Sequence, residues 1–137
     1  MRMPWIMTQR WAHLLYLHYR VDPVQLRTLV PDGLELDLID GSHWVSLIPL
    51  RMERVHLRDM VPIPTTNQFP ELNLRTYVHH GETAGVWFLS IDAASWFSPQ
   101  IARRVFRLPY HSAEMTFAER DGTYHFTSSR RRAKEVQ

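Results

Sequence analysis

The sequence of 137 residues contains no cysteine. This absence excludes disulfide bonds, thiolate metal ligands and a thiol nucleophile. It is compatible with a reducing compartment, so we expect a cytoplasmic protein. The length, with 45% apolar residues, is sufficient for one core but not for two independent ones. We therefore expect a single domain over residues 1–137.

Lysine is nearly absent, because Lys134 is the only one against fifteen arginines. A desolvated lysine can lose its proton and form an imine, whereas arginine stays protonated and binds carboxylate or phosphate. The bias itself is typical of genomic base composition. The basic tail "SSRRRAK" is of the short, solvated kind, and the net charge is only +2. We expect no nucleic-acid partner.

The sequence also lacks the motifs of several common sites. It has only five glycines and neither GxGxxG nor GxxxxGK[ST], which argues against a phosphate-binding loop. It has no GxSxG and no HExxH, and the adjacent His79 and His80 would point to opposite faces of a strand. We expect no cofactor and no metal.

No apolar stretch approaches the roughly 20 residues that a membrane-spanning helix requires. The first twenty residues, "MRMPWIMTQRWAHLLYLHYR", carry Arg2 and Arg10 and lack the apolar run and cleavage site of a secretion signal. We expect a soluble, unprocessed chain without a membrane partner.

The first half of the sequence predicts a strand, a short helix and a hairpin. Residues 11–21 are apolar and aromatic, as in a buried strand. "DPVQLRTLVPDG" predicts a helix capped by Asp22 and ended by Pro31. The alternation over 34–39 and the "DG" at 40–41 predict a hairpin over 34–52.

The second half begins with a proline-rich connection over 53–70, which could be a binding loop or an ordinary surface loop. A buried strand over 86–93, a helix over 98–107 and two strands over 110–119 and 123–129 follow. The sequence thus predicts an α+β domain with a mostly antiparallel sheet or barrel and two short helices.

The segment "ELNLRTYVHH" places polar and apolar side chains on opposite faces of a strand. The polar face contains Glu71, Asn73, Arg75, Tyr77 and His79. In an open sandwich this face would meet water, whereas in a closed barrel it could line a cavity.

Tyr110 and His111 begin a strand just after a helix and Pro109, in "FRLPYHSAEM". A phenol, an imidazole and the Glu71 carboxyl could perform acid-base chemistry if the fold brought them together. Spacing alone does not show that they converge.

Three segments carry a family resemblance: "YRVDPVQLRTLVPDGLELD", "FPELNLRTYVHHGETAGVWFLSIDA" and "ARRVFRLPYHSAEM". The first resembles the acetoacetate decarboxylase superfamily, and the other two resemble the YqjF-like proteins, a related family of unknown function. The resemblance implies a decarboxylase-like barrel around a central cavity. Members of the family are generally longer, which leaves three alternatives: a fragment, a shortened member, or a protomer that borrows strands from a partner. We expect the N-terminal portion of the domain, in which the barrel could be incomplete.

The resemblance also bears on the chemistry. In the decarboxylase, two consecutive lysines occupy the place of Tyr110 and His111, and the first lysine forms a Schiff base with the ketone. Neither residue here can form an imine, so we expect no Schiff-base decarboxylase activity. The resemblance further implies a cavity glutamate, best matched by Glu71.

We therefore predict an acetoacetate decarboxylase-like protein that binds a small carbonyl or carboxylate compound. Its candidate acid-base residues are Glu71, Tyr110 and His111, and its candidate ligand-binding residues are Asn73, Arg75 and Tyr77. The alternative is a non-catalytic oligomerisation or protein-interaction module built on large aromatic residues. In either case we expect a homo-oligomer.

Overall fold

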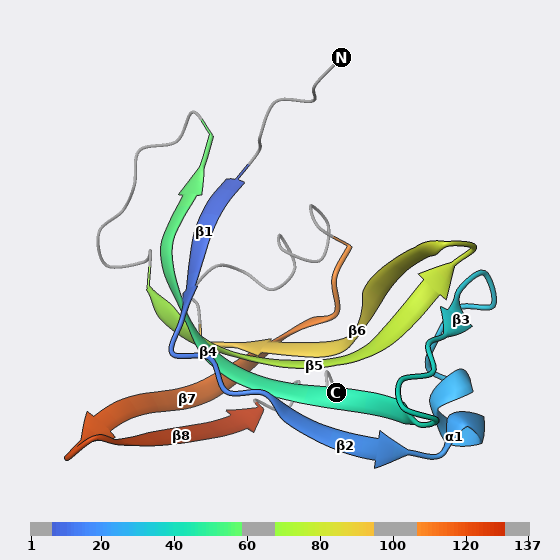
Figure 1. Cartoon of the computed structure of the whole chain (residues 1–137). Coiled ribbons are helices and arrows are strands. Elements are labelled where there is room, and N and C mark those ends of the chain that lie inside the picture. The colour runs from blue at the N-terminus through green and yellow to red at the C-terminus, as the bar shows by residue number, and fades with distance from the viewer. Residues whose placement is uncertain (1–6, 59–67, 95–106, 131–137) are drawn as a thin grey trace, which may run out of the picture.

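The computed structural model describes residues 7–58, 68–94 and 107–130. These residues form mainly strands (Figure 1). In chain order the elements are β1 (Met7–Ala12), β2 (Leu17–Val21), α1 (Pro23–Arg27), β3 (Glu35–Leu36), β4 (His43–Leu57), β5 (Phe69–His80), β6 (Thr83–Ala93), β7 (Tyr110–Arg120) and β8 (Thr123–Arg130).

The strands form one curled sheet with the order β1-β4-β5-β6-β7-β8. In addition, β2 pairs with β4, and β3 pairs with β5. All pairs are antiparallel except β6 with β7, which run parallel. Figure 1 shows that the long strands bend strongly, so that the sheet has the shape of a half-barrel. The mostly antiparallel β fold is thus confirmed.

Helix α1 forms as its sequence predicts. The Asp22 side chain accepts a hydrogen bond of 2.9 Å from the Val24 amide, and Pro23 occupies the first turn, where an amide hydrogen would have no partner. After the helix, the Arg27 guanidinium donates to the backbone carbonyls of Val30 and Leu34. The Arg27 side chain therefore stabilises the turn that follows the helix.

The second helix, predicted over 98–107, falls almost wholly outside the described residues and stays a prediction. Only Arg107 of that segment is described, and it is not helical. Within the described ranges, the chain has no helix of the length and apolarity that crossing a bilayer requires.

The hairpin predicted over 34–52 is wrong in its pairing, although its turn is right. Asp40 and Gly41 both have positive φ, 50° and 70°, as a type I′ turn requires. However, β3 pairs with β5, and between the two arms the backbone pairing is limited to the bridge between Ile39 and Ser42. The alternating segment before the turn therefore contributes the short strand β3, which pairs with β5.

Two other boundaries differ from the prediction. The strand expected over 11–21 is two strands, β1 and β2, separated near His13, whose φ is 53°. The connection expected over 53–70 is shorter, because β4 continues to Leu57 and β5 begins at Phe69. The expected binding loop or surface loop falls on residues 59–67, which lie outside the described ranges.

A compact apolar cluster lies on one face of β4. Ile48 and Leu50 have no exposed surface and Met52 is 3% exposed, while Trp11 and Phe69 pack against them. Burying each such side chain contributes about 1.5–3 kcal/mol. This cluster holds β1, β4 and β5 together beside the polar residues described next.

Candidate functional site

The strand register places the candidate residues on one side of the sheet, which we call the Glu71 face. Residues directly opposite each other on paired strands point to the same side. One row across the sheet consists of Leu50, Glu71, Ala93 and Ser112, and the next of Ile48, Asn73, Ile91 and Tyr110. The part of the predicted polar face of β5 that contains Glu71 and Asn73 is therefore buried beside the apolar cluster.

Glu71 is buried in this face, with 2% of its surface exposed. Burial raises the pKa of its carboxyl from 4.5 to about 7, and the polar side chain of Asn73 opposes this increase in part. Its Oε2 atom has no hydrogen-bond partner in the described parts of the chain. Near neutral pH the carboxyl can therefore hold or release a proton.

Asn73 has no exposed surface, so its polar side-chain amide is fully buried, which is unusual for such a group. Neither its side-chain oxygen nor its side-chain nitrogen has a hydrogen-bond partner among the described residues. Because buried polar groups are normally paired, a donor and an acceptor are available here.

Tyr110 lies on the same face, separated from Asn73 by Ile91 in the row. Its phenol is partly buried, and burial together with the charge of Glu71 raises its pKa. The hydroxyl therefore keeps its proton near neutral pH and can act as a hydrogen-bond donor.

His111 lies on the opposite side of the sheet. It is in register with Asp92, whereas its neighbour Tyr110 is in register with Ile91. Adjacent strand residues point to opposite faces, so the two side chains diverge. The Asp92 carboxylate on that side accepts hydrogen bonds of 3.0 and 2.6 Å from the Arg130 guanidinium. The structure thus brings Tyr110 to Glu71 and directs His111 away.

Arg75 and Tyr77 continue the Glu71 face along β5. The Arg75 guanidinium lies over the rings of Tyr16 and Tyr77, at 5.7 and 5.9 Å from their centres. The Tyr77 hydroxyl is 2.9 Å from the Ser46 Oγ, and the same Oγ is 2.7 Å from His18 Nδ1. Five of the six predicted site residues therefore share one face.

Sequence reasoning missed Tyr16, His18 and Ser46 at this end of the face. The alternation of "YLHYR" places Tyr16, just before β2, and His18, in β2, on one side, and His18 pairs with Ser46 on β4. The alternation was visible in the sequence. The pairing of β2 with β4 was not.

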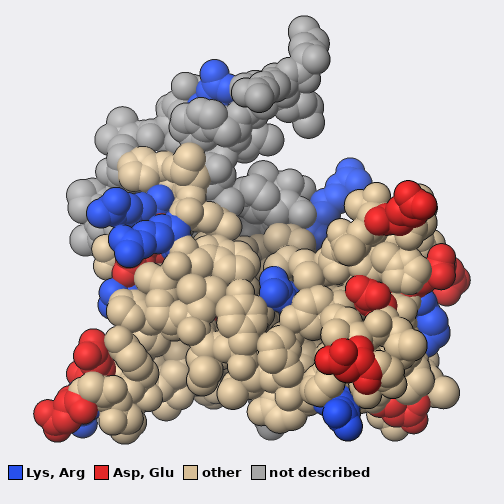
Figure 2. Space-filling view, viewed as in Figure 1, with Lys and Arg blue, Asp and Glu red and all other residues tan. Residues whose placement is uncertain are grey.

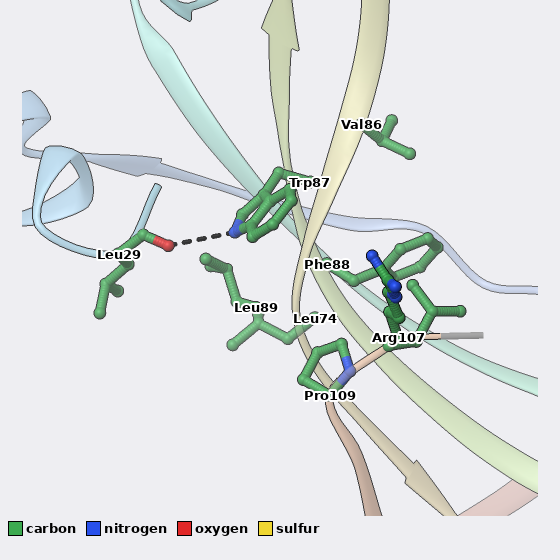
Figure 3. A pocket seen from close by; sticks show the side chains of 9 residues that line it. Leu29, Leu74, Val86, Trp87, Phe88, Leu89, Arg107 and Pro109 are labelled. Carbon is green, nitrogen blue, oxygen red and sulfur yellow. Dashed lines mark hydrogen bonds between the residues drawn. The ribbon is translucent and has the colours of Figure 1, made fainter. Parts of the chain in front are cut away.

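A groove lies at the edge of β6 (Figure 3). It has a volume of about 860 Å³, and its walls are mainly apolar. We call it the Trp87 groove. Its lining includes Leu29, Leu74, Trp87, Leu89, Arg107 and Pro109. The Trp87 indole Nε1 donates a hydrogen bond of 3.1 Å to the Leu29 carbonyl, so the ring is held by the turn after α1.

In Figure 2 the middle of the surface is mostly uncharged, with a basic side chain near its centre, and most acidic and basic side chains lie toward the sides. In the described portions of the chain, no three histidine or acidic residues are grouped so that they could hold a metal ion.

Several solved structures share this fold. The enduracididine biosynthesis enzyme MppR, in complex with the condensation product of pyruvate and imidazole 4-carboxaldehyde, matches with a TM-score of 0.69 and 16% identity, over 86% of this chain and 44% of that one. Acetoacetate decarboxylase from Legionella pneumophila matches with a TM-score of 0.67 and 16% identity, over 88% of this chain and 44% of that one. At this identity the likeness shows the fold: it is that of the acetoacetate decarboxylases.

A sequence relative is closer. The uncharacterized protein YqjF of Bacillus subtilis is 40% identical over 132 residues, which are 96% of this chain and 54% of YqjF. The chain thus spans about half the length of the relative it matches. Residues 8–137 also match the family DUF2071, described as uncharacterized conserved protein, and the chain belongs to this family.

Proposed function

We propose that the chain binds a small organic molecule with a carbonyl or carboxylate group on the Glu71 face. The observation that carries this proposal is the pair Glu71 and Asn73, both almost fully buried: Glu71 Oε2 and both polar atoms of the Asn73 side chain lack hydrogen-bond partners in the described ranges. Each unpaired buried group costs about 1–3 kcal/mol. A ligand that supplies a donor and an acceptor would offset this cost.

The proposed roles follow from the protonation states. Glu71, with a pKa of about 7, exchanges a proton with the ligand or orients it. Tyr110 donates a hydrogen bond to a ligand oxygen. Asn73, Arg75 and Tyr77 contact the rest of the ligand. We assign no direct contact to His111, because its side chain points to the other side of the sheet.

The structural relatives support this choice of ligand chemistry. MppR is described in complex with pyruvate, and another match is an acetoacetate decarboxylase. Pyruvate and acetoacetate both carry a carbonyl and a carboxylate group. The relatives share the fold but little sequence, so the proposal depends on the residues of this chain.

The proposed chemistry contains no Schiff base. Tyr110 and His111 stand where the resemblance places the paired lysines, and the only lysine is Lys134. Any reaction at the Glu71 face would therefore proceed by proton transfer or electrostatic stabilisation.

The test is a binding screen by ligand-observed NMR with acetone, acetate, pyruvate and acetoacetate. We expect at least one compound to bind the unaltered chain and to bind Glu71→Gln several-fold more weakly. Glu119→Gln, which changes an exposed carboxylate at the end of β7, should bind like the unaltered chain. Binding that is equal in both variants would contradict the proposal, as would no binding of any compound.

A second candidate function is oligomerisation, favoured by the apolar lining of the Trp87 groove. A homo-oligomer in the cytoplasm fits both functions, and we propose it for the chain. If the groove forms the contact between copies, Trp87→Ala would lower the mass measured by light scattering. An unchanged mass would exclude this role for the groove.

A further inference from the structure

Three aromatic side chains gather around His18 at the end of the Glu71 face that lies beyond Arg75. The Tyr16 ring stacks on the His18 ring, with 6.0 Å between centres and 16° between planes. Trp44 meets His18 edge-on at 6.5 Å, and Tyr77 is tilted at 6.3 Å. These rings come from the segment before β2 and from β2, β4 and β5, so separate parts of the sheet contribute to one surface.

Hydrogen bonds fix the position of this group. Ser46 has no exposed surface, and its Oγ contacts both His18 Nδ1 and the Tyr77 hydroxyl. The strand pair of His18 with Ser46 holds the backbone below them. The rings are therefore positioned in advance of any ligand, which lowers the entropic cost of binding.

Arg75 lies beside these rings and has no acidic partner among the residues that the structure describes. Its Nε is buried and makes no hydrogen bond there. By contrast, Arg51 and Arg130 are paired with Glu53 and Asp92 at 2.7 and 2.6 Å. Within the described ranges Arg75 is held only over the rings of Tyr16 and Tyr77, and no residue there neutralises its charge, so that charge can meet an anion.

We infer that Arg75, Tyr16, His18 and Tyr77 form a subsite for an aromatic carboxylate. The guanidinium fork fits the two oxygens of a carboxylate. Tyr16, with 45% of its surface exposed, offers a ring on which a second planar ring can stack. The inference rests on the proposed function, because Asn73 is the next residue along this face from Arg75 and would contact the same ligand.

Isothermal titration calorimetry with benzoate and indole-3-carboxylate tests the subsite. We expect saturable binding of at least one acid by the unaltered chain and at least tenfold weaker binding by Arg75→Gln, because the charge-assisted hydrogen bonds are lost. Arg120→Gln, which changes an exposed arginine at the end of β7, should bind normally. Benzamide, which has the same ring without the charge, should bind far more weakly.

The contribution of the rings is tested separately. Tyr16→Ala should weaken the binding of aromatic acids several-fold while leaving the binding of acetate unaffected. Tyr19→Ala, which changes a tyrosine of β2 that is 52% exposed and alternates to the other side, should leave both unaffected. Inorganic phosphate distinguishes a carboxylate site from a general anion site, because the subsite should prefer the flat carboxylate.

Three results would overturn the inference: no binding of either acid, equal binding by Arg75→Gln, or phosphate binding as tight as that of the acids. Its failure is distinguishable from failure of the proposed function. If small carbonyl compounds still bind in a manner sensitive to Glu71→Gln, the proposed function stands and only the aromatic carboxylate subsite falls.

Discussion

The pKa of the Tyr110 phenol is raised by burial and, in addition, by the charge of Glu71 on the neighbouring row of the same face. The two residues are 39 positions apart in the sequence (71 and 110) and meet because β7 aligns in parallel with the end of β6. Near neutral pH, Tyr110 stays protonated while Glu71 exchanges its proton. One face thus offers a stable donor beside a carboxyl that titrates.

Glu71 should make the stability of the fold depend on pH. In the unfolded chain its carboxyl has its ordinary pKa of 4.5, and in the folded chain about 7. The stabilising contribution of the protonated form is therefore complete below pH 4.5 and is lost as the pH rises to about 7. The loss amounts to about 3 kcal/mol for this difference in pKa.

Urea unfolding at about pH 4 and about pH 8 measures this loss. The Glu71→Gln variant should lack it, because the amide is neutral at both pH values. Glu119→Gln should retain it. An equal pH dependence in the unaltered chain and in Glu71→Gln would show that Glu71 is not responsible.

Tyr110 and His111 should differ in their effect on ligand binding. Tyr110→Phe removes one hydroxyl from the Glu71 face. It should weaken the binding of a ligand found in the binding screen about tenfold, which is the effect of losing one good hydrogen bond. His111→Gln changes the opposite side of the sheet and should leave the affinity unchanged. Titration of both variants by NMR gives the comparison, and a larger loss in His111→Gln would show that the faces are assigned wrongly.

The ion pair of Asp92 with Arg130 should hold the β7–β8 hairpin against β6. The Asp92 side chain is 11% exposed, whereas that of Arg130 is 46% exposed, so solvent screens the pair in part. Arg130→Gln leaves Asp92 buried without its cation and should cost about 1–2 kcal/mol of unfolding free energy. Urea unfolding measures the loss, with Arg120→Gln as the exposed control; equal stability of the two variants would argue against the role of the pair.

The sequence predicted best the features that depend on neighbouring residues. The Asp22 cap, the turn at Asp40 and the polar alternation from Glu71 to Tyr77 all arise from local backbone geometry, and all are present in the structure. The family was also identified correctly from three segments.

Features that depend on strand pairing were not predictable in this way. The local pattern pairs residues 34–39 with the strand that follows, yet β3 joins β5, because a short edge strand can pair with any free edge nearby. The burial of Glu71 required the register of β4 and β6, which no spacing reveals. The divergence of Tyr110 and His111, by contrast, follows from the alternation already applied to His79 and His80.

The absence of a Schiff base is testable by reduction. The chain incubated with acetone and sodium borohydride should show no stoichiometric increase in mass, because Tyr110 and His111 cannot form an imine. Peptide mapping distinguishes an adduct at the N-terminal amine from one at Lys134. A stoichiometric adduct on Lys134 would contradict the proposed chemistry.

The most direct test of the account is the pH titration of the Glu71 carboxyl by carbon-13 NMR, with its signal assigned by comparison with Glu71→Gln. A carboxyl buried on a ligand-binding face should titrate with a midpoint of about 7. A midpoint near 4.5, the ordinary value, would show that Glu71 is solvated and would contradict the proposed site.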